Sequence, residues 1–256
     1  MTTKQYYFIS SLEKGLNVLS LLAENGAMRV SQVAAALGYN RAGAHRFLST
    51  LRDLGYVQQT PGGEYEPTFK ILELSTKVAS RFEIRKSASL FMRNLSAATK
   101  ETINLGFIQG TDVIHLDKID SPELLRMDPE IGSRAPAQNT ALGKAILAFL
   151  PPAELELFFS RADWTALTSN SNTTREGLLL ELDKVRRNGW AMDNEELCPG
   201  LRCIAVPIFD SQDYPRYAIS ISGPSMRMSD DRMPGMRDGL LAASRELSQK
   251  LKELGP

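Results

Sequence analysis

Cysteine and histidine are scarce in this chain, with two residues of each among 256. Two cysteines cannot build a disulfide framework, which favours the reducing cytoplasm. Their spacing from the histidines matches no zinc motif, so neither a metal site nor a cofactor is expected. No apolar run approaches the ~20 residues of a membrane-spanning helix, and the first residues lack the apolar core of a signal peptide. We therefore expect a soluble cytoplasmic protein without a membrane partner.

Net charge is also lacking, because 30 Lys and Arg balance 30 Asp and Glu. The balance hides an asymmetry: residues 1–85 carry a net charge of +3 and residues 86–256 a net charge of −3. A basic segment joined to an acidic body is what a nucleic-acid-binding module on a sensor domain would show, although a difference of three charges can also arise by chance. The apolar fraction of 43% excludes wholesale disorder. The length suggests one large domain or two modest ones.

Three helices are predicted near the N-terminus. Leucines that recur every three or four positions predict the first helix over 11–25. Ser31 is expected to cap a short second helix over 32–37, and Asn40 to cap a third helix over 41–54. Two helices joined by a tight glycine turn form the helix-turn-helix arrangement, in which the last helix lies in the major groove of DNA.

The start of the third helix leaves polar side chains exposed. Arg can pair with a guanine edge, and His or Ser can contact bases or phosphates. Small residues at the helix start allow close approach to DNA, where the helix dipole favours a phosphate. The alternative is a merely solvated face, but a hairpin with the tip TPGG at 60–63 follows as a wing and favours DNA binding. The expected DNA-binding residues are Ser31, Asn40, Arg41, Ala42, His45, Arg46 and Ser49.

Residues 68–83 are predicted to form a linker helix between a DNA-binding domain over 1–67 and a second domain over 84–256. In the second domain, strands are predicted over 102–109, 112–119, 124–127, 203–209 and 217–222. Helices are predicted over 84–100, 140–150, 174–188 and from 229 past 251. Strands grouped at both ends of the segment, with helices between them, indicate an α+β domain with an antiparallel-rich sheet.

Several motifs in order resemble the IclR family of bacterial transcription regulators. They are SLEKGLNVL at 11–19, HRFLSTLRDLGYV at 45–57, TALGKA at 140–145, GLRCIAVPIFD at 200–210 and SISGP at 220–224. The resemblance covers roughly residues 10–251, and 102–127 is most similar to the branch that senses sugar acids such as 2-keto-3-deoxygluconate. It implies a winged helix-turn-helix followed by a GAF-like effector-binding domain. It also implies a homodimer or a dimer of dimers on double-stranded operator DNA.

The resemblance further implies an effector pocket. Positions that match the family's ligand contacts are Leu124, Met127, Ala141, Leu142, Asp193, Cys203, Ser220 and Ser222. The residues support this, because the two serines share one face of a strand and their hydroxyls need partners that a polar ligand can supply. The helix start at Thr140 offers N–H groups to a carboxylate. Asn139 stands where the family commonly has a small residue, and Gln138 where it commonly has His. Asn139 and Thr140 therefore join the expected effector-binding residues.

No catalytic residues are expected. Neither histidine belongs to a serine-nucleophile motif, and the GKA at 143–145 lacks the rest of a phosphate-binding loop. Asp193, Glu195 and Glu196 resemble a carboxylate cluster for acid–base chemistry, but a ligand acceptor at Asp193 beside two solvated glutamates is the preferred interpretation. The leading hypothesis is a ligand-responsive repressor that senses a small organic acid. The alternative is an enzyme that acts on a small acid through the C-terminal domain.

Overall fold

The computed structural model describes residues 8–79 and 82–253. The chain divides into two compact units, Met1–Phe82 and Glu83–Pro256. Each unit has a buried apolar cluster of its own. Within the described ranges, no helix combines the length and the apolar character that crossing a membrane requires.

The predicted linker helix over 68–83 matches the structure only in part. α4 (Phe69–Ala79) lies within it, and a separate helix, α5 (Glu83–Thr99), begins at its last residue. Positions 80 and 81 lie outside the described residues, so the full extent of the linker stays a prediction.

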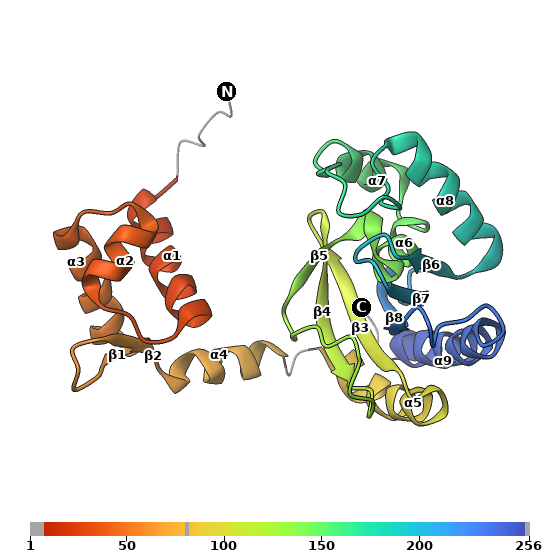
Figure 1. The fold of residues 1–256 in the computed structure, drawn as a ribbon, viewed down its shortest axis with the longest axis horizontal. Helices are drawn as coiled ribbons and strands as arrows, with labels where there is room; N and C mark the ends of the chain where they lie inside the picture. The colour runs from red at the N-terminus through yellow and green to blue at the C-terminus, as the bar shows by residue number, and fades with distance from the viewer. Residues whose placement is uncertain (1–7, 80–81, 254–256) are drawn as a thin grey trace. The chain divides into compact units, whose positions relative to one another are not determined.

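The N-terminal unit is a small helical core closed by a hairpin (Figure 1). Its elements are α1 (Ser10–Asn25), α2 (Val30–Leu37), α3 (Arg41–Asp53), β1 (Val57–Gln59) and β2 (Tyr65–Pro67), followed by α4. Side chains about one turn apart on the three helices are buried together, among them Val18, Leu22, Val33, Leu48 and Leu51. β1 and β2 pair antiparallel and form the wing. The predicted winged helix-turn-helix is confirmed.

The predicted caps of α2 and α3 have different outcomes. Asn40 caps α3, because its Oδ1 accepts the Gly43 N–H at 2.7 Å. The predicted cap at Ser31 is wrong, because α2 begins one residue before it. There, Oε1 of Gln32 accepts the Arg29 N–H at 2.8 Å, so the longer amide side chain satisfies the helix start from within the first turn.

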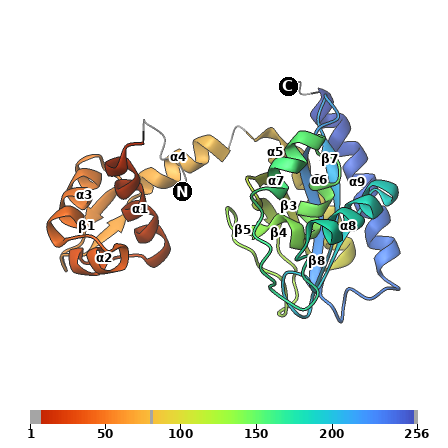
Figure 2. The ribbon, with the colours of Figure 1, turned by 90° about the horizontal axis from the view of Figure 1, so that it is seen from above.

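The C-terminal unit contains a six-stranded antiparallel sheet in the order β5-β4-β3-β8-β7-β6. The strands are β3 (Thr102–Gln109), β4 (Asp112–Ile119), β5 (Arg134–Pro136), β6 (Ala191–Asn194), β7 (Leu201–Phe209) and β8 (Pro215–Pro224). The helices are α5, α6 (Ala141–Leu147), α7 (Pro152–Phe159), α8 (Arg175–Asn188) and α9 (Met233–Glu253), with a 3-10 turn over Ala137–Asn139. α5 and α9 pack side by side on one face, and α6 covers the other (Figures 1 and 2). The predicted α+β class is confirmed.

The predicted strand over 124–127 is wrong, because this segment is irregular. Side chains from other elements take its backbone carbonyls: Thr102 Oγ1 donates to the Met127 oxygen at 2.7 Å, and Arg227 Nη2 donates to the Leu125 oxygen at 2.9 Å. A carbonyl held in this way is not paired with a neighbouring strand.

Other element boundaries also differ from the predictions. The predicted helix over 140–150 is shorter, and α7 follows it with Pro152 in its first turn, where the fixed φ of proline suits a helix start. β5 and β6 were not predicted. The closing helix begins at Met233 instead of 229, and Asp230, which lies before it, accepts a hydrogen bond from Arg202 Nη1 at 3.1 Å.

Candidate nucleic-acid interface and ligand site

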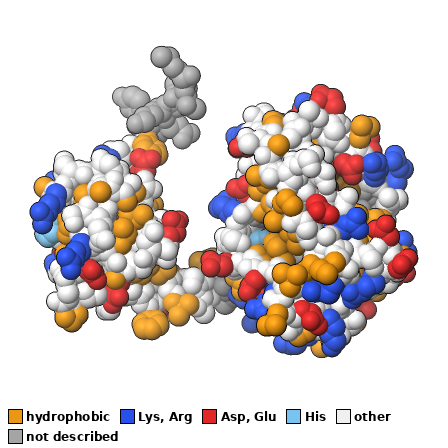
Figure 3. All heavy atoms as spheres, viewed as in Figure 1, with side chains coloured by type: hydrophobic (Ala, Val, Ile, Leu, Met, Phe, Trp, Pro, Cys, Tyr) orange, Lys and Arg blue, Asp and Glu red, His pale blue; other side chains and the backbone are white. Residues whose placement is uncertain are grey.

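The exposed face of α3 gathers four of the predicted DNA-binding residues. Arg41, Ala42, His45 and Arg46 line one surface depression together with Val30 of α2. In Figure 3, Lys, Arg and His side chains lie together on this side of the N-terminal unit. Neither of the two arginines forms an ion pair with another described residue, so both guanidinium groups are available to a polyanion.

The three other predicted residues surround this face less directly. Ser31 is exposed on α2, and Ser49 is half-buried on α3. The side-chain oxygen of Asn40 is already used to cap α3. Asn40 therefore fixes where the helix starts, and through that start it orients the basic side chains.

A row of polar side chains crosses four strands of the C-terminal sheet. Asp193 on β6 lies opposite Cys203 on β7, which lies opposite Ser222 on β8, which lies opposite Thr102 on β3. Directly opposed residues of antiparallel strands share a face. All four side chains are buried, and their face is the one that α6 covers, because Cys203 packs in the same apolar cluster as Ala141 of that helix.

The polar character continues in the next two rows of this face. Ser220 on β8 lies opposite Asn104 on β3, and the Asn104 Nδ2 lies 3.4 Å from the Ser220 Oγ and 3.1 Å from the Ser222 Oγ. One row further, His115 on β4 lies opposite Gly106 on β3. Three strands and α6 thus enclose hydroxyl, amide and imidazole groups in an otherwise apolar layer.

Five buried side-chain atoms of the described residues have no hydrogen-bond partner. They are Asn104 Oδ1, His115 Nδ1, Gln138 Oε1, Asn139 Nδ2 and Asp193 Oδ2. Each unpaired buried polar group costs ~1–3 kcal/mol. Three lie on the covered sheet face, and the other two lie in the turn that leads into α6. Unused hydrogen-bonding capacity is therefore concentrated where the sheet and α6 meet.

The Asp193 carboxyl has an altered acidity. Burial raises its pKa from 3.8 to about 7, although the Glu196 N–H, which donates to its Oδ1 at 2.8 Å, opposes this rise. Burial and the neighbouring Asp193 also raise the pKa of the Cys203 thiol well above its ordinary value. A neutral thiol is a weak nucleophile, so the raised pKa does not favour a catalytic role for Cys203.

The start of α6 is held by close backbone packing. The Thr140 Oγ1 accepts the Gly143 N–H at 3.0 Å and caps the helix. A Cβ on Gly143 would lie 2.1 Å from the Ala137 oxygen, so only glycine allows this approach. Asn139 lies just before the cap, where its Oδ1 accepts the Asn172 N–H at 2.7 Å.

The structure brings most of the predicted effector residues together, with one exception. Asn139, Thr140, Ala141, Leu142, Asp193, Cys203, Ser220 and Ser222 are buried around the covered sheet face. Met127 is half-buried against the same apolar cluster. Leu124 is 100% exposed and does not join them.

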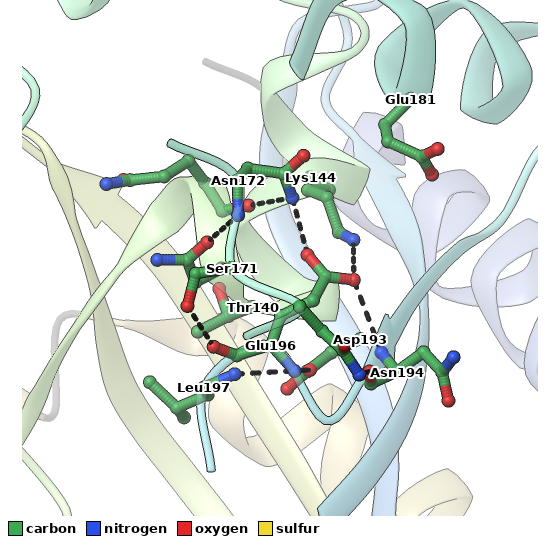
Figure 4. Close-up of polar contacts among 12 residues, drawn as sticks. Thr140, Lys144, Ser171, Asn172, Glu181, Asp193, Asn194, Glu196 and Leu197 are labelled. Carbon is green, nitrogen blue, oxygen red and sulfur yellow. Dashed lines mark hydrogen bonds and ion pairs between the residues drawn. The ribbon is translucent and has the colours of Figure 1, made fainter. Parts of the chain in front are cut away.

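Sequence reasoning missed several members of this site. Glu196, interpreted as solvated, is 7% exposed, and its Oε1 accepts a hydrogen bond from Lys144 Nζ at 2.5 Å. Figure 4 shows both side chains directed toward each other beside Asp193 and Asn172. The incomplete phosphate-loop motif gives Lys144 no role, yet a lysine within the apolar segment of α6 signals a buried partner.

Asn104 and His115 were also missed, although each interrupts an apolar strand in the way that drew attention to the β8 serines. No group of three or more His, Cys, Asp or Glu side chains in the described ranges is arranged to hold a metal ion.

Both units are similar to known proteins. A family model described as the IclR helix-turn-helix domain matches residues 11–61, and one described as the C-terminal region of the bacterial transcriptional regulator IclR matches residues 76–249. The HTH-type transcriptional regulator KdgR of Escherichia coli (strain K12) is 36% identical over 249 residues, 97% of this chain and 95% of that protein.

Solved structures give the same result. The crystal structure of the Thermotoga maritima IclR aligns with a TM-score of 0.81 at 30% identity, covering 96% of this chain and 100% of that one. The crystal structure of the C-terminal domain of E. coli KdgR aligns with a TM-score of 0.62 at 37% identity, covering 67% of this chain and 99% of that one.

Proposed function

Because this chain belongs to the IclR family of bacterial transcription regulators, we propose that it is a repressor that releases its operator when a small organic acid binds the C-terminal unit. The chain is a regulator and not an enzyme, so the catalytic alternative is discarded. The observation that carries the proposal is the concentration of unpartnered buried polar atoms beneath α6. Such capacity is costly in a protein that binds nothing there.

In this proposal the protein acts in the cytoplasm, and α3 enters the major groove of the operator DNA. Arg41 and Arg46 contact guanine edges or phosphates, and His45 contacts a neighbouring base. Ala42 allows close approach. Ser31, Asn40 and Ser49 flank this face and contact the phosphate backbone, which positions the helix without reading sequence.

The chemistry of the free atoms defines the effector class. Asn139 Nδ2 is a donor that suits a carboxylate oxygen, whereas Asn104 Oδ1 and Asp193 Oδ2 accept from hydroxyls. Leu142 and Met127 form apolar walls. A compact hydroxylated carboxylate fits this combination, and the similarity of 102–127 to the sugar-acid branch favours 2-keto-3-deoxygluconate as the first candidate.

The remaining proposed contacts are Thr140, Ala141, Cys203, Ser220 and Ser222, all buried at this face. Leu124 is left out because its side chain is fully exposed.

The repressor is proposed to act as a homodimer or a dimer of dimers. α1, α3 and α4 surround a groove lined by apolar side chains, among them Leu12, Leu16, Leu54 and Leu74, all of which are exposed in a single copy. A second copy would bury them. Two copies would also present two α3 helices to two half-sites one helical turn apart. Leu16→Asp should lower the mass measured by light scattering to that of one chain; an unchanged mass would place the contact elsewhere.

An operator can be obtained by selecting bound duplexes from a random DNA library. We expect 2-keto-3-deoxygluconate to raise the melting temperature of the full chain and to release the selected duplex in mobility-shift assays. D-gluconate, which carries more hydroxyl groups, and pyruvate, which is shorter, serve as comparisons. Ser222→Ala should reduce both effects, whereas Ser211→Ala, on an exposed turn, should not. If none of the carboxylates tested produces a shift or release, the effector class is wrong.

A further inference from the structure

Two side chains of the effector site are each held at one end and free at the other. Asp193 Oδ1 accepts the Glu196 N–H at 2.8 Å, whereas its Oδ2 has no partner. Asn139 Oδ1 accepts the Asn172 N–H at 2.7 Å, whereas its Nδ2 has no partner. Both bonded oxygens are connected to Glu196. Asp193 Oδ1 is bonded to it directly, and Asn139 Oδ1 is connected to it through Asn172, whose Nδ2 donates to Glu196 Oε2.

Glu196 joins three parts of the chain that lie far apart in sequence. Its Oε1 accepts from Lys144 Nζ of α6 at 2.5 Å and from the Asn194 N–H at 3.2 Å. Its Oε2 accepts from Asn172 Nδ2 at 2.5 Å, and its backbone oxygen accepts from the Ser171 Oγ at 2.7 Å. Figure 4 shows these groups converging beside Asp193.

The Lys144–Glu196 pair is poorly explained by stability alone. The two side chains are 1% and 10% exposed, and burying two charges costs desolvation that their attraction roughly offsets. Apolar residues of similar size commonly stabilise a fold as much or more. The Lys144–Glu196 pair is therefore better explained by the groups whose positions it fixes.

We propose that Lys144 and Glu196 are a positioning pair for Asp193, fixing the turn that presents its free oxygen and balancing the charge beside it. Glu196 supplies the N–H that turns Oδ2 toward the site, and Lys144 anchors Glu196 to α6. This inference rests on the proposed function only in treating Asp193 as an effector-binding residue.

The charged and titratable groups that face Asp193 are few. Lys144 faces it from α6, Glu196 from its own turn and the Cys203 thiol from β7. α8, which also packs on β6, contributes buried apolar side chains. Glu196 favours the protonated form of Asp193 and Lys144 favours the ionised form, so the two partners act on its pKa in opposite directions.

The test is a titration of the Asp193 carboxyl carbon by NMR in the full chain, without effector. Glu196→Gln should lower the measured pKa of Asp193 by about one pH unit, because a negative charge is lost while Lys144 remains. The double variant K144M/E196Q should lower it less, because both charges are gone. The matched control is Glu181→Gln, which breaks the exposed Lys184–Glu181 pair of α8 and should leave the titration unchanged.

A pKa of Asp193 that is unchanged or raised in Glu196→Gln would overturn the proposal. Should that variant not fold, the double variant decides, because two neutral side chains avoid an unpaired buried charge. There the opposite effects of the two charges on Asp193 nearly cancel, so a shift of its pKa by about one pH unit or more in either direction overturns the proposal equally. An effector response that survives Asp193→Ala, with the titration as expected, would refute the proposed effector site and leave the positioning of Asp193 intact.

Discussion

Replacing Asp193 by Asn should stabilise the C-terminal unit at alkaline pH. The carboxyl is 1% exposed, and burial raises its pKa from 3.8 to about 7. Because the folded chain holds this proton more tightly than the unfolded chain, the contribution of Asp193 to stability is intact below pH 3.8 and is lost as pH rises through about 7. At ~1.4 kcal/mol for each pKa unit, ionised Asp193 costs the fold about 4 kcal/mol at pH 8.

Asparagine removes this cost and keeps the known contact, because its Oδ1 still accepts the Glu196 N–H. We expect Asp193→Asn to be more stable than the parent protein by up to about 4 kcal/mol at pH 8 and to have about the same stability at pH 4. Urea unfolding followed by tryptophan fluorescence measures the correct unit, since both tryptophans, Trp164 and Trp190, lie in it.

The control is Asp238→Asn, an exposed carboxylate of α9, which should change stability little at either pH. A stability difference for Asp193→Asn that is the same at pH 4 and pH 8 would refute the reasoning, as would a loss of stability at pH 8. Either result would mean that ionisation of the buried Asp193 carboxyl between pH 4 and pH 8 does not destabilise the fold. Effector binding should nevertheless weaken in this variant. Residues that bind a ligand are commonly retained although they destabilise the fold, and Asp193 is proposed to be such a residue.

The remaining predictions concern both units. Arg46→Ala should weaken binding to the selected operator by ~1–3 kcal/mol if the guanidinium reads a base edge, whereas Arg52→Ala, which removes a side chain already paired on α3, should weaken it less; equal losses in mobility shifts would contradict this. Gly223→Ala should destabilise the C-terminal unit by ~1–3 kcal/mol, because a Cβ would lie 2.5 Å from a buried carboxylate oxygen. Gly235→Ala, with no neighbour within 4 Å, is its control in urea unfolding, and equal stabilities of the two variants would show that β8 can shift.

Elements bounded by local signals were predictable from the sequence. The hairpin of β3 and β4 was predicted with its observed limits, because two strand-like runs meet at the turn residues Gly110 and Thr111. β5 and β6 were missed because strands of three and four residues show no clear alternation, and they exist through pairing with longer strands. The apolar residues around Leu125 predict a strand, but the segment is irregular. Its conformation depends on Arg227, which donates to the Leu125 oxygen and is too far along the chain to show in the local pattern.

The site divides in the same way. Ser220 and Ser222 are implied by the family resemblance, and their spacing supports this because it places both on one face of one strand. Asn104 and Lys144 were missed because the partner of each lies far along the chain. The Asn104 amide bonds to Ser222, and the Lys144 ammonium group bonds to Glu196. A polar residue in an apolar run signals a buried interaction, but the fold decides with which group.

Calorimetric titration of the effector acid into the full chain tests the central claim most directly. The claim is that the buried polar row beneath α6 binds the effector. With the carboxylate that gives the largest thermal shift, Ser220→Ala and Ser222→Ala should each weaken binding by about 5- to 150-fold, the equivalent of ~1–3 kcal/mol for a lost hydrogen-bond partner. Operator affinity without effector should stay unchanged. If both variants bind the acid as tightly as the parent protein, the effector site lies elsewhere and the account is wrong.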